Sequence, residues 1–182
     1  ILLHAFKDAP AFNLNFNYRS VVGKLNYLAQ TTRPDIMYAV HQIEKFSADP
    51  REPHGDAIQY LVRYLKKTRH LGLKFKPDES KGFECYCDAD FAGNWNKDFA
   101  QHDPSTAKSR SGWVIFYARC PIIWASKLQS QVALSTTEAE YIAMSMALRD
   151  VIPIMELIKE MKVMPFLLSP LNLTSTARYL KT

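Results

Sequence analysis

The spacing of hydrophobic residues changes once along this chain of 182 residues, and the change predicts two differently folded parts. From Tyr18 to about residue 70, apolar residues recur every three or four positions, which predicts helices. From Leu71 the sequence "LGLKFK" alternates between apolar and polar residues, and "FECYCDAD" does so after the turn at "PDES". Such alternation predicts strands. The expected fold class is therefore α/β (α+β), a helical unit followed by a sheet with a long helix packed on it.

The first part is predicted to contain three helices. One runs from Tyr18 to Thr31, and the next begins at "TTRPDI", where Thr32 and Asp35 have the spacing of a capping box. We therefore expect Asp35 to cap a helix rather than to belong to a site. A third helix is predicted from about His54 to Lys67. Its predicted core positions are Ile58, Leu61, Val62 and Leu65.

In the second part, "GWVIFYA" and "IIWASK" predict an antiparallel pair of strands, because the connection between them is short. "SQVAL" is expected to add one more short strand. Ser135 and Glu138 have the S-x-x-E spacing of a capping box, which predicts the start of the longest helix. Pro153 is expected to split or bend that helix, and the sequence loses any clear period after Met161.

The composition restricts the kind of protein more than it defines a function. A formal net charge of +5 and a pI near 9.1 give a hint of an acidic partner such as nucleic acid. No window approaches the roughly 18 apolar residues of a membrane span, and no secretory leader is recognisable. We therefore expect a cytoplasmic or nuclear protein that is not secreted and does not bind membranes. The cysteines Cys85, Cys87 and Cys120 form no CxxC pair, so we expect neither a disulfide framework nor a zinc ribbon. Cys85 and Cys87 are expected to be small core residues on one face of a strand rather than metal ligands.

Two pairs of acidic residues lie where a charge costs free energy unless a positive group compensates it: at the end of a predicted strand and at the start of a predicted helix. Alternation places Asp88 and Asp90 on one side of a strand, at its end. Glu138 is already the capping partner of Ser135, whereas the sequence assigns no such role to Glu140, which is therefore the acid we expect to serve a site. An aspartate ending a strand and a glutamate on a helix packed against that sheet can together hold Mg²⁺. On spacing alone, the simpler alternative is favoured, in which the aspartates merely end a strand and Glu140 is solvated.

The third predicted helix also offers a surface for phosphates. Four basic residues lie opposite its predicted core positions: Arg63, Lys66, Lys67 and His70. Such a stripe can neutralise phosphates without reading sequence, and a simply solvated helix face explains it equally well. Aromatic side chains that stack on bases are a further option, although residues at such spacing more often belong to a core. These aromatic candidates are Tyr60, Tyr64, Trp95 and Trp113.

Three segments together resemble one family: "YRSVVGKLNYLAQTTRPDIMYAV", "CDADFAGNW" and "SRSGWVIFYARCPIIWASKLQSQVALSTTEAEYIAMS". In this order they resemble the Pol polyprotein of copia-type LTR retrotransposons, at the end of reverse transcriptase and in the ribonuclease H that follows. The resemblance covers roughly Tyr18 to Lys162 and overturns the simpler alternative for the acidic residues. It implies a thumb-like or connection-like helical unit at 1–70, a partial ribonuclease-H-like domain at 71–162 and a divergent tail at 163–182.

The resemblance also implies an activity, cleavage of RNA in RNA–DNA hybrids with Mg²⁺ or Mn²⁺. Asp88 matches the first aspartate of the family's D-A-D motif and Glu140 the glutamate of its A-E-Y motif. Both are thereby implied as catalytic residues and metal ligands, with Asp90 as a further metal ligand. Ser109, Arg110 and Ser111 match a polar segment of the family. The predicted nucleic-acid-binding residues are Arg63, Lys66, Lys67, Arg110 and Ser111.

The chain departs from this family after Met161. Family members continue with a strand that carries a third aspartate and later with a final acidic residue, whereas residues 162–182 contain no acid. Asp150 cannot easily replace them, because it lies about 15 Å along the helix axis from Glu140. Asp98 and Asp103 in the loop stay open as alternatives, although loop acids are usually solvated. We therefore expect weak or single-metal binding, little ribonuclease activity in the isolated chain, and an open sheet edge where strands are missing. The alternative is a non-catalytic relic that binds nucleic acid or another protein, including the remaining parts of the polyprotein.

Overall fold

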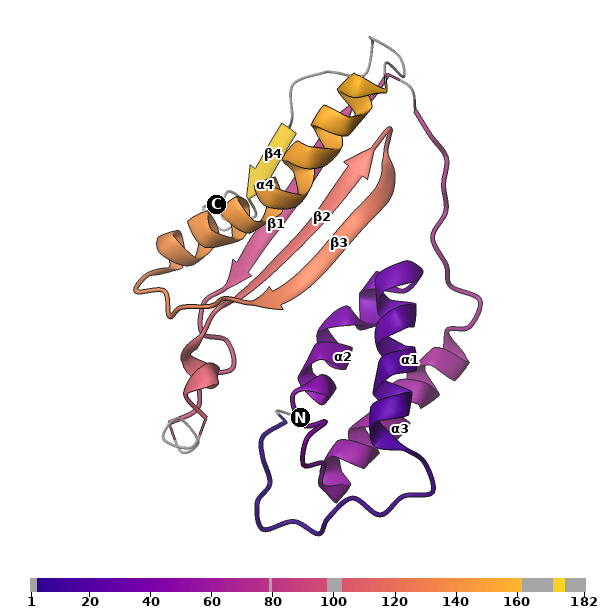
Figure 1. Cartoon of the computed structure of the whole chain (residues 1–182), viewed down its shortest axis with the longest axis vertical. Helices are drawn as coiled ribbons and strands as arrows, with labels where there is room; N and C mark the ends of the chain where they lie inside the picture. The colour runs from indigo at the N-terminus through magenta and orange to yellow at the C-terminus, as the bar shows by residue number, and fades with distance from the viewer. Residues whose placement is uncertain (1–2, 79, 98–102, 162–171, 176–182) are drawn as a thin grey trace. The chain divides into compact units, whose positions relative to one another are not determined.

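The computed structural model describes residues 3–78, 80–97, 103–161 and 172–175, the last of these for the backbone alone. The chain divides into two compact units, Ile1–Leu73 and Lys74–Thr182 (Figure 1). The mixture of a helical unit and a sheet with one long helix confirms the predicted α+β fold class. No helix in the described part of the chain is long and apolar enough to cross a membrane.

The first unit is helical, and its helices follow from the spacing of buried apolar residues. Asn17 caps the first helix through the backbone N–H of Ser20, and that helix buries Val22, Leu25 and Ala29 at intervals of three and four residues. The helical elements are α1 (Tyr18–Thr31), the 3-10 helix η1 (Pro34–Ile36), α2 (Met37–Glu44) and α3 (Glu52–Lys67). The predicted bounds of the first helix are confirmed, and α3 begins two residues before the predicted start.

The segment before α1 packs on the start of α3 through His54, whose side chain is fully buried. Its ring stacks on Phe46 with 4.1 Å between centroids. Its Nδ1 accepts a hydrogen bond of 2.9 Å from the backbone N–H of Arg51, and its Nε2 lies 2.8 Å from the carbonyl oxygen of His4. Both ring nitrogens are therefore satisfied when the imidazole is neutral, with its proton on Nε2.

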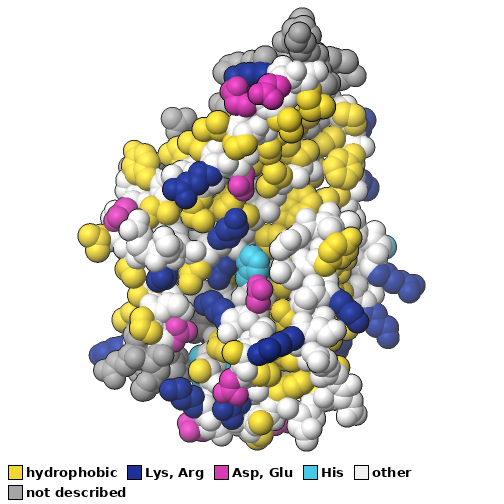
Figure 2. Space-filling model, in the orientation of Figure 1, with side chains coloured by type: hydrophobic (Ala, Val, Ile, Leu, Met, Phe, Trp, Pro, Cys, Tyr) yellow, Lys and Arg dark blue, Asp and Glu magenta, His cyan; other side chains and the backbone are white. Residues whose placement is uncertain are grey.

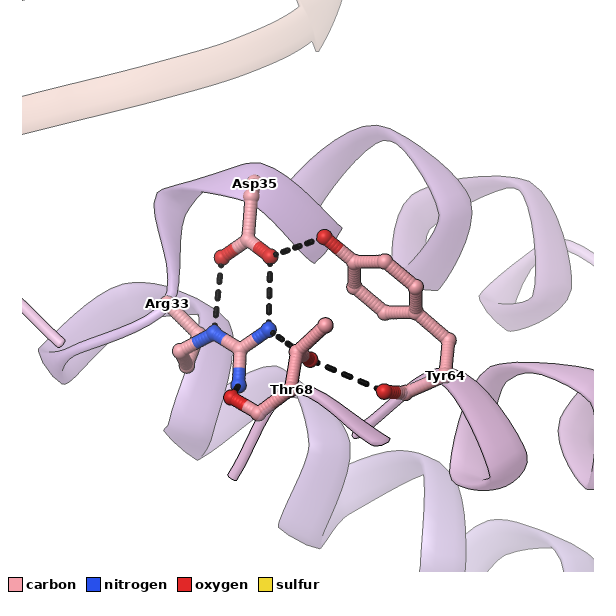
Figure 3. A network of polar contacts seen from close by, with 4 residues as sticks. All are labelled: Arg33, Asp35, Tyr64 and Thr68. Carbon is pink, nitrogen blue, oxygen red and sulfur yellow. Dashed lines mark hydrogen bonds and ion pairs between the residues drawn. The ribbon is translucent and has the colours of Figure 1, made fainter. Parts of the chain in front are cut away.

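Asp35 corrects one prediction about this unit, because it does not cap a helix with Thr32. Thr32 ends α1, and the carboxylate of Asp35 instead accepts two hydrogen bonds from Arg33, at 2.8 and 2.7 Å (Figure 3). An ion pair with Arg33, held in place by Thr68 and Tyr64 from α3 and its end, has replaced the cap that the spacing favoured. Val62 is a second error, since its side chain is 45% exposed while Ile58 and Leu61 are buried as predicted.

The second unit is a sheet with the strand order β3-β2-β1-β4, covered on one face by α4 (Figure 1). Strands β1, β2 and β3 are antiparallel neighbours, which confirms the predicted pair, and β4 runs parallel to β1. The elements are β1 (Phe83–Asp90), the 3-10 helix η2 (Pro104–Ala107), β2 (Arg110–Tyr117), β3 (Cys120–Leu128), α4 (Thr136–Glu160) and β4 (Asn172–Ser175).

Small residues on α4 allow the helix to lie close to the sheet. This alanine ridge consists of Ala139, Ala143 and Ala147, all fully buried, and continues at Val151. It faces a core that includes Phe83, Cys85, Cys87, Trp113 and Ile115. The three cysteines are buried and free, and the burial of Cys85 and Cys87 confirms the prediction for these two. The alternating residues of β1, among them Tyr86 and Asp88, are exposed on the other side of the strand.

Three further predictions about the second unit are wrong. Residues 71–76 and 130–134 form no strand. Alternation alone does not make a strand, because a strand also needs a paired neighbour and the sheet is built from other segments. Pro153 does not split α4, which continues through it to Glu160. The edge of β1 is not open, since β4 covers it from Glu84 to Cys87 with residues of the tail that showed no period.

Candidate active site at the end of strand β1

The carboxylate of Glu140 reaches the peptide that follows Asp88. The backbone N–H of Ala89 donates to Oε1 of Glu140 across 3.4 Å. Since that nitrogen is bonded to the carbonyl carbon of Asp88, covalent geometry keeps the two carboxylates within roughly 8 Å of each other. The Glu140 carboxylate therefore lies near the backbone of Asp88, whereas the Asp88 side chain is exposed on the opposite face of β1 from Cys87, away from α4. Their catalytic role stays a prediction.

Glu140 reaches β1 because the start of α4 is fixed by a cap. The hydroxyl of Ser135 accepts the N–H of Glu138 at 3.1 Å, and Glu138 accepts the N–H of Leu134 at 2.7 Å. Glu138 thus has a capping role, as the sequence indicated, although its partner is the residue before Ser135. Glu140 is half-buried and turned toward the strand.

The buried amide of Gln129 joins the two segments that carry the acids. Its Nε2 donates to the hydroxyl of Ser111 and to the carbonyl oxygen of Ala139, each at 2.9 Å. Ser111 lies opposite Ala89 in the sheet, and Ala139 immediately precedes Glu140. The sequence analysis missed Gln129, because a single glutamine between a strand and a helix gives no periodic indication that it is buried.

Asp90 lies against its own loop. A β-carbon placed on Gly93 would overlap the Asp90 carboxylate in its present position, so a larger residue there would require the Asp90 side chain to move. In the sheet, Asp90 pairs with Arg110, which is 6% exposed and donates to the carbonyl oxygen of Ser126 at 3.2 Å. Asp90 is itself exposed, and its part in metal binding stays a prediction.

The pKa values of nearby thiols reflect the negative charge at this end of the sheet. Burial raises the pKa of the Cys87 thiol, and the charges of Glu140 and Asp88 raise it further. Burial, with smaller effects of Cys87 and Asp150, raises the pKa of Cys85 to about 11. Both thiols therefore stay protonated near neutral pH and are poor nucleophiles. Asp150 accepts a hydrogen bond from the indole of Trp113 at 2.9 Å and belongs to the packing of α4.

The donor set fits a hard divalent cation only in part. Asp88 and Glu140 supply carboxylate oxygens, and Mg²⁺ is commonly held by one or two carboxylates together with water and substrate phosphates. The described residues contain no group of three or more His, Cys, Asp or Glu side chains that could hold a metal. Metal binding by Asp88 and Glu140, and the number of ions bound, therefore stay predictions.

The predicted nucleic-acid-binding residues fall into two environments. Arg63, Lys66 and Lys67 are exposed on α3, and Figure 2 shows several Lys and Arg side chains projecting from the first unit. Arg110 is 6% exposed and Ser111 has no exposed surface. In this structure Ser111 contributes to packing through Gln129, and its contact with nucleic acid stays a prediction.

The sheet, the helix packed on it and the paired acids at the end of β1 define the class: an α+β protein with a candidate acidic site. Neither a protein-family model nor a solved structure matches the chain. The chain is 40% identical over 124 residues to the retrovirus-related Pol polyprotein from transposon RE1 of Arabidopsis thaliana. It is 41% identical over 128 residues to that from transposon TNT 1-94 of Nicotiana tabacum. The chain belongs to the family of retrovirus-related Pol polyproteins of copia-type retrotransposons, which confirms the resemblance seen in its sequence.

The extent of these matches limits what they say about activity. They cover 68% and 69% of this chain but only 8% and 9% of the two polyproteins. A third relative, named secreted RxLR effector protein 161 of Plasmopara viticola, is 36% identical over 138 residues. That match covers 76% of this chain and 91% of the relative. Related sequences thus occur both inside long polyproteins and in a short protein of about this size.

Proposed function

We propose that the second unit is a ribonuclease-H-like domain that cuts the RNA strand of an RNA–DNA hybrid with Mg²⁺ or Mn²⁺, and does so weakly. The observation that carries this proposal is the hydrogen bond from the Ala89 N–H to Glu140, which brings the glutamate to the residue after Asp88. Membership of a Pol family supports the same chemistry, although the comparisons cover only a small part of each polyprotein.

In this proposal Asp88 and Glu140 hold the cation, and Asp90 contributes at the margin. A bound divalent cation would supply a polarised water and charge stabilisation at the scissile phosphate. Glu140 is positioned by the Ser135 cap and by its bond to β1, so its carboxylate is ordered before the metal arrives. The low number of carboxylates leaves much of the cation's charge uncompensated, which is why we expect low affinity and slow cleavage.

A labelled RNA–DNA hybrid, incubated with the full chain in Mg²⁺ and in Mn²⁺, tests the proposal. We expect slow cleavage that Asp88→Asn and Glu140→Gln each abolish. Glu138→Gln is the matched control, because Glu138 lies in the same helical turn and accepts a hydrogen bond that glutamine can still accept. We expect this variant to cleave like the unchanged chain.

Two results would contradict this proposal in different ways. Cleavage that persists in both Asp88→Asn and Glu140→Gln would remove these residues from the chemistry and point to a contaminating nuclease. Rapid turnover that depends on Asp88 would refute the expected weakness. Absence of cleavage under all conditions would leave the second candidate, a non-catalytic protein that binds nucleic acid.

That second candidate is supported by the exposed side chains of Arg63, Lys66 and Lys67 on one helix. Such contacts are made to phosphates and lose affinity steeply as salt rises. Filter binding of the hybrid at two salt concentrations tests them, and a signal that is absent or insensitive to salt would exclude the stripe. Other parts of a Pol polyprotein are the proposed protein partners in this setting.

A further inference from the structure

We propose that the groove between α2 and α3 binds unpaired bases of single-stranded nucleic acid, which stack on tyrosine rings at its rim. The inference rests on the proposed nucleic-acid binding of the first unit, and it adds a site and a strand preference to it. The groove has a volume of about 710 Å³ and lies wholly within the helical unit. Its apolar walls include Ile36, Ala39, Ala57 and Leu61.

Three tyrosines with exposed rings line this groove. Tyr60 is 72% exposed, Tyr38 46% and Tyr64 39%. Large aromatic side chains normally lose most of their surface to a core, so a cluster of exposed rings around one groove indicates a binding surface. Every base has an aromatic face, and stacking on tyrosine binds a strand without regard to its sequence.

Cationic side chains alternate with these rings along α3. Tyr60, Arg63, Tyr64 and Lys67 follow the spacing i, i+3, i+4 and i+7, which places them on one helix face. Arg63 lines the groove itself. Aromatic rings for bases beside cations for phosphates are the two elements that proteins combine to bind single strands. In a duplex the faces of the bases are covered by their neighbours, so the rings would gain no stacking partner.

The ring of Tyr64 is held in place before any ligand arrives (Figure 3). Its hydroxyl donates to Oδ2 of Asp35 at 2.9 Å, and Asp35 is bound by two nitrogens of Arg33. Arg33 is 6% exposed and also donates to the hydroxyl and the carbonyl oxygen of Thr68, at 2.8 and 3.2 Å. A ring fixed in this way loses little conformational freedom on binding, which favours affinity.

The charges along the groove indicate where the phosphates and the bases of a bound nucleic-acid strand would lie. The carboxylate of Asp35 is neutralised by Arg33, and this ion pair with its hydrogen bonds lowers the pKa of Asp35. Asp56, an exposed lining residue, repels phosphate at its end of the groove. Arg63 lies two helical turns away, about 10 Å along the axis, and attracts phosphate there. The backbone is therefore expected at the Arg63 end, with bases directed toward Tyr60 and Tyr38.

Fluorescence anisotropy of the full chain with three labelled probes tests this site: a single-stranded oligo-dT, the same strand in a duplex, and an abasic strand of equal length. We expect the oligo-dT to bind more tightly than the abasic strand. Tyr60→Leu should weaken oligo-dT binding about tenfold, in line with the loss of one stacked base, and leave duplex binding unchanged.

Tyr27→Leu is the matched control, because Tyr27 is also 72% exposed but lies on α1 and does not line the groove. It should leave the binding of all three probes unchanged. Arg63→Gln should weaken the binding of oligo-dT and of the abasic strand equally. It should also reduce the salt dependence of the binding constant by the amount expected for the loss of about one phosphate contact. Circular dichroism of each variant verifies that the helices are intact.

The outcomes separate this inference from the broader proposal. Equal binding of oligo-dT and abasic strands, or equal effects of Tyr60→Leu and Tyr27→Leu, would overturn the stacking site while phosphate binding by α3 still stands. Absence of binding to every probe would overturn both. Self-association that Tyr60→Leu abolishes would identify a second copy of the chain as the occupant of the groove and would also overturn the inference.

Discussion

Replacing Gln129 with methionine tests whether one buried amide holds the candidate active site together. The substitution preserves length and volume but removes both donated hydrogen bonds, to Ser111 and to the carbonyl oxygen of Ala139. Since Gln129 is 1% exposed, water cannot replace the lost donor without an opening of the structure. We expect the second unit to be destabilised and Glu140 to lose its fixed position.

The structure sets the size of this effect. Each buried polar group left without a partner costs about 1–3 kcal/mol. Part of this cost is offset, because Oε1 of Gln129 already has no hydrogen-bond partner among the described residues and methionine removes it. We therefore expect a loss of about 2 kcal/mol in the free energy of unfolding, which lowers the Tm of a domain of this size by about 10 °C.

Tryptophan fluorescence can report the second unit alone, because Trp95, Trp113 and Trp124 all lie in it. Urea unfolding followed by this fluorescence gives the change in the free energy of unfolding. Amide hydrogen exchange adds a local measurement that needs no metal. In Gln129→Met the N–H of Ala89, which donates to Glu140, should exchange faster by more than the global loss of stability explains.

Gln131→Met provides the control, since Gln131 is exposed two residues further along the chain. It should change the free energy of unfolding by less than about 0.5 kcal/mol. If Gln129→Met were as stable as this control, the amide would not be a necessary link between β2 and α4. If Gln129→Met were less stable but the Ala89 amide stayed protected, the link would serve the fold without positioning Glu140.

Two further predictions concern His54 and Gly93. Burial lowers the pKa of His54, so the unfolded chain binds a proton more readily than the folded chain. The stability that the neutral ring contributes is therefore present above about pH 6.5, the pKa of an unperturbed histidine, and is lost as the pH falls toward the pKa in the folded state. Urea unfolding of the helical unit, followed by circular dichroism, should give lower stability at pH 5 than at pH 7 in the unchanged chain and a smaller difference in His54→Gln; equal differences would contradict this. Gly93→Ala should cost less than about 1 kcal/mol, because the added methyl meets the end of the flexible Asp90 side chain, which can rotate away. A larger loss in urea unfolding would show that Asp90 is held in place, and a lower Mn²⁺ affinity would indicate that Asp90 helps to bind metal.

The features that could be predicted from the sequence are those fixed by local pattern. Alternation in "FECYCDAD" gave both the strand and the side on which Asp88 lies, because each strand side chain turns opposite to the last. The helix start at Ser135 followed from capping chemistry that needs only four consecutive residues. The approach of Glu140 to β1 followed from the family resemblance and the expectation of a helix packed on the sheet.

The features that could not be predicted depend on partners far away in the sequence. "LGLKFK" alternates like a strand but forms none, since pairing is decided by the rest of the sheet. Asp35 had a plausible cap in Thr32, yet it pairs with the guanidinium of Arg33. The residues that fix this pair are distant in the sequence, because Thr68 accepts from Arg33 and Tyr64 donates to Asp35. The backbone of β4 pairs with β1 although its sequence shows no period, because ladder hydrogen bonds are made by the main chain.

The small side chains of the alanine ridge on α4 determine how closely Glu140 can approach Asp88. Ala139 adjoins Glu140, and the whole helix can rest on the sheet only as closely as its buried side chains allow. A bulkier residue at Ala143 would push α4 away from the sheet and move Glu140 away from β1, although every acidic residue would still be present. A retrotransposon protein of this kind could therefore lose the proposed activity through a substitution in its hydrophobic core, with the predicted catalytic residues unchanged.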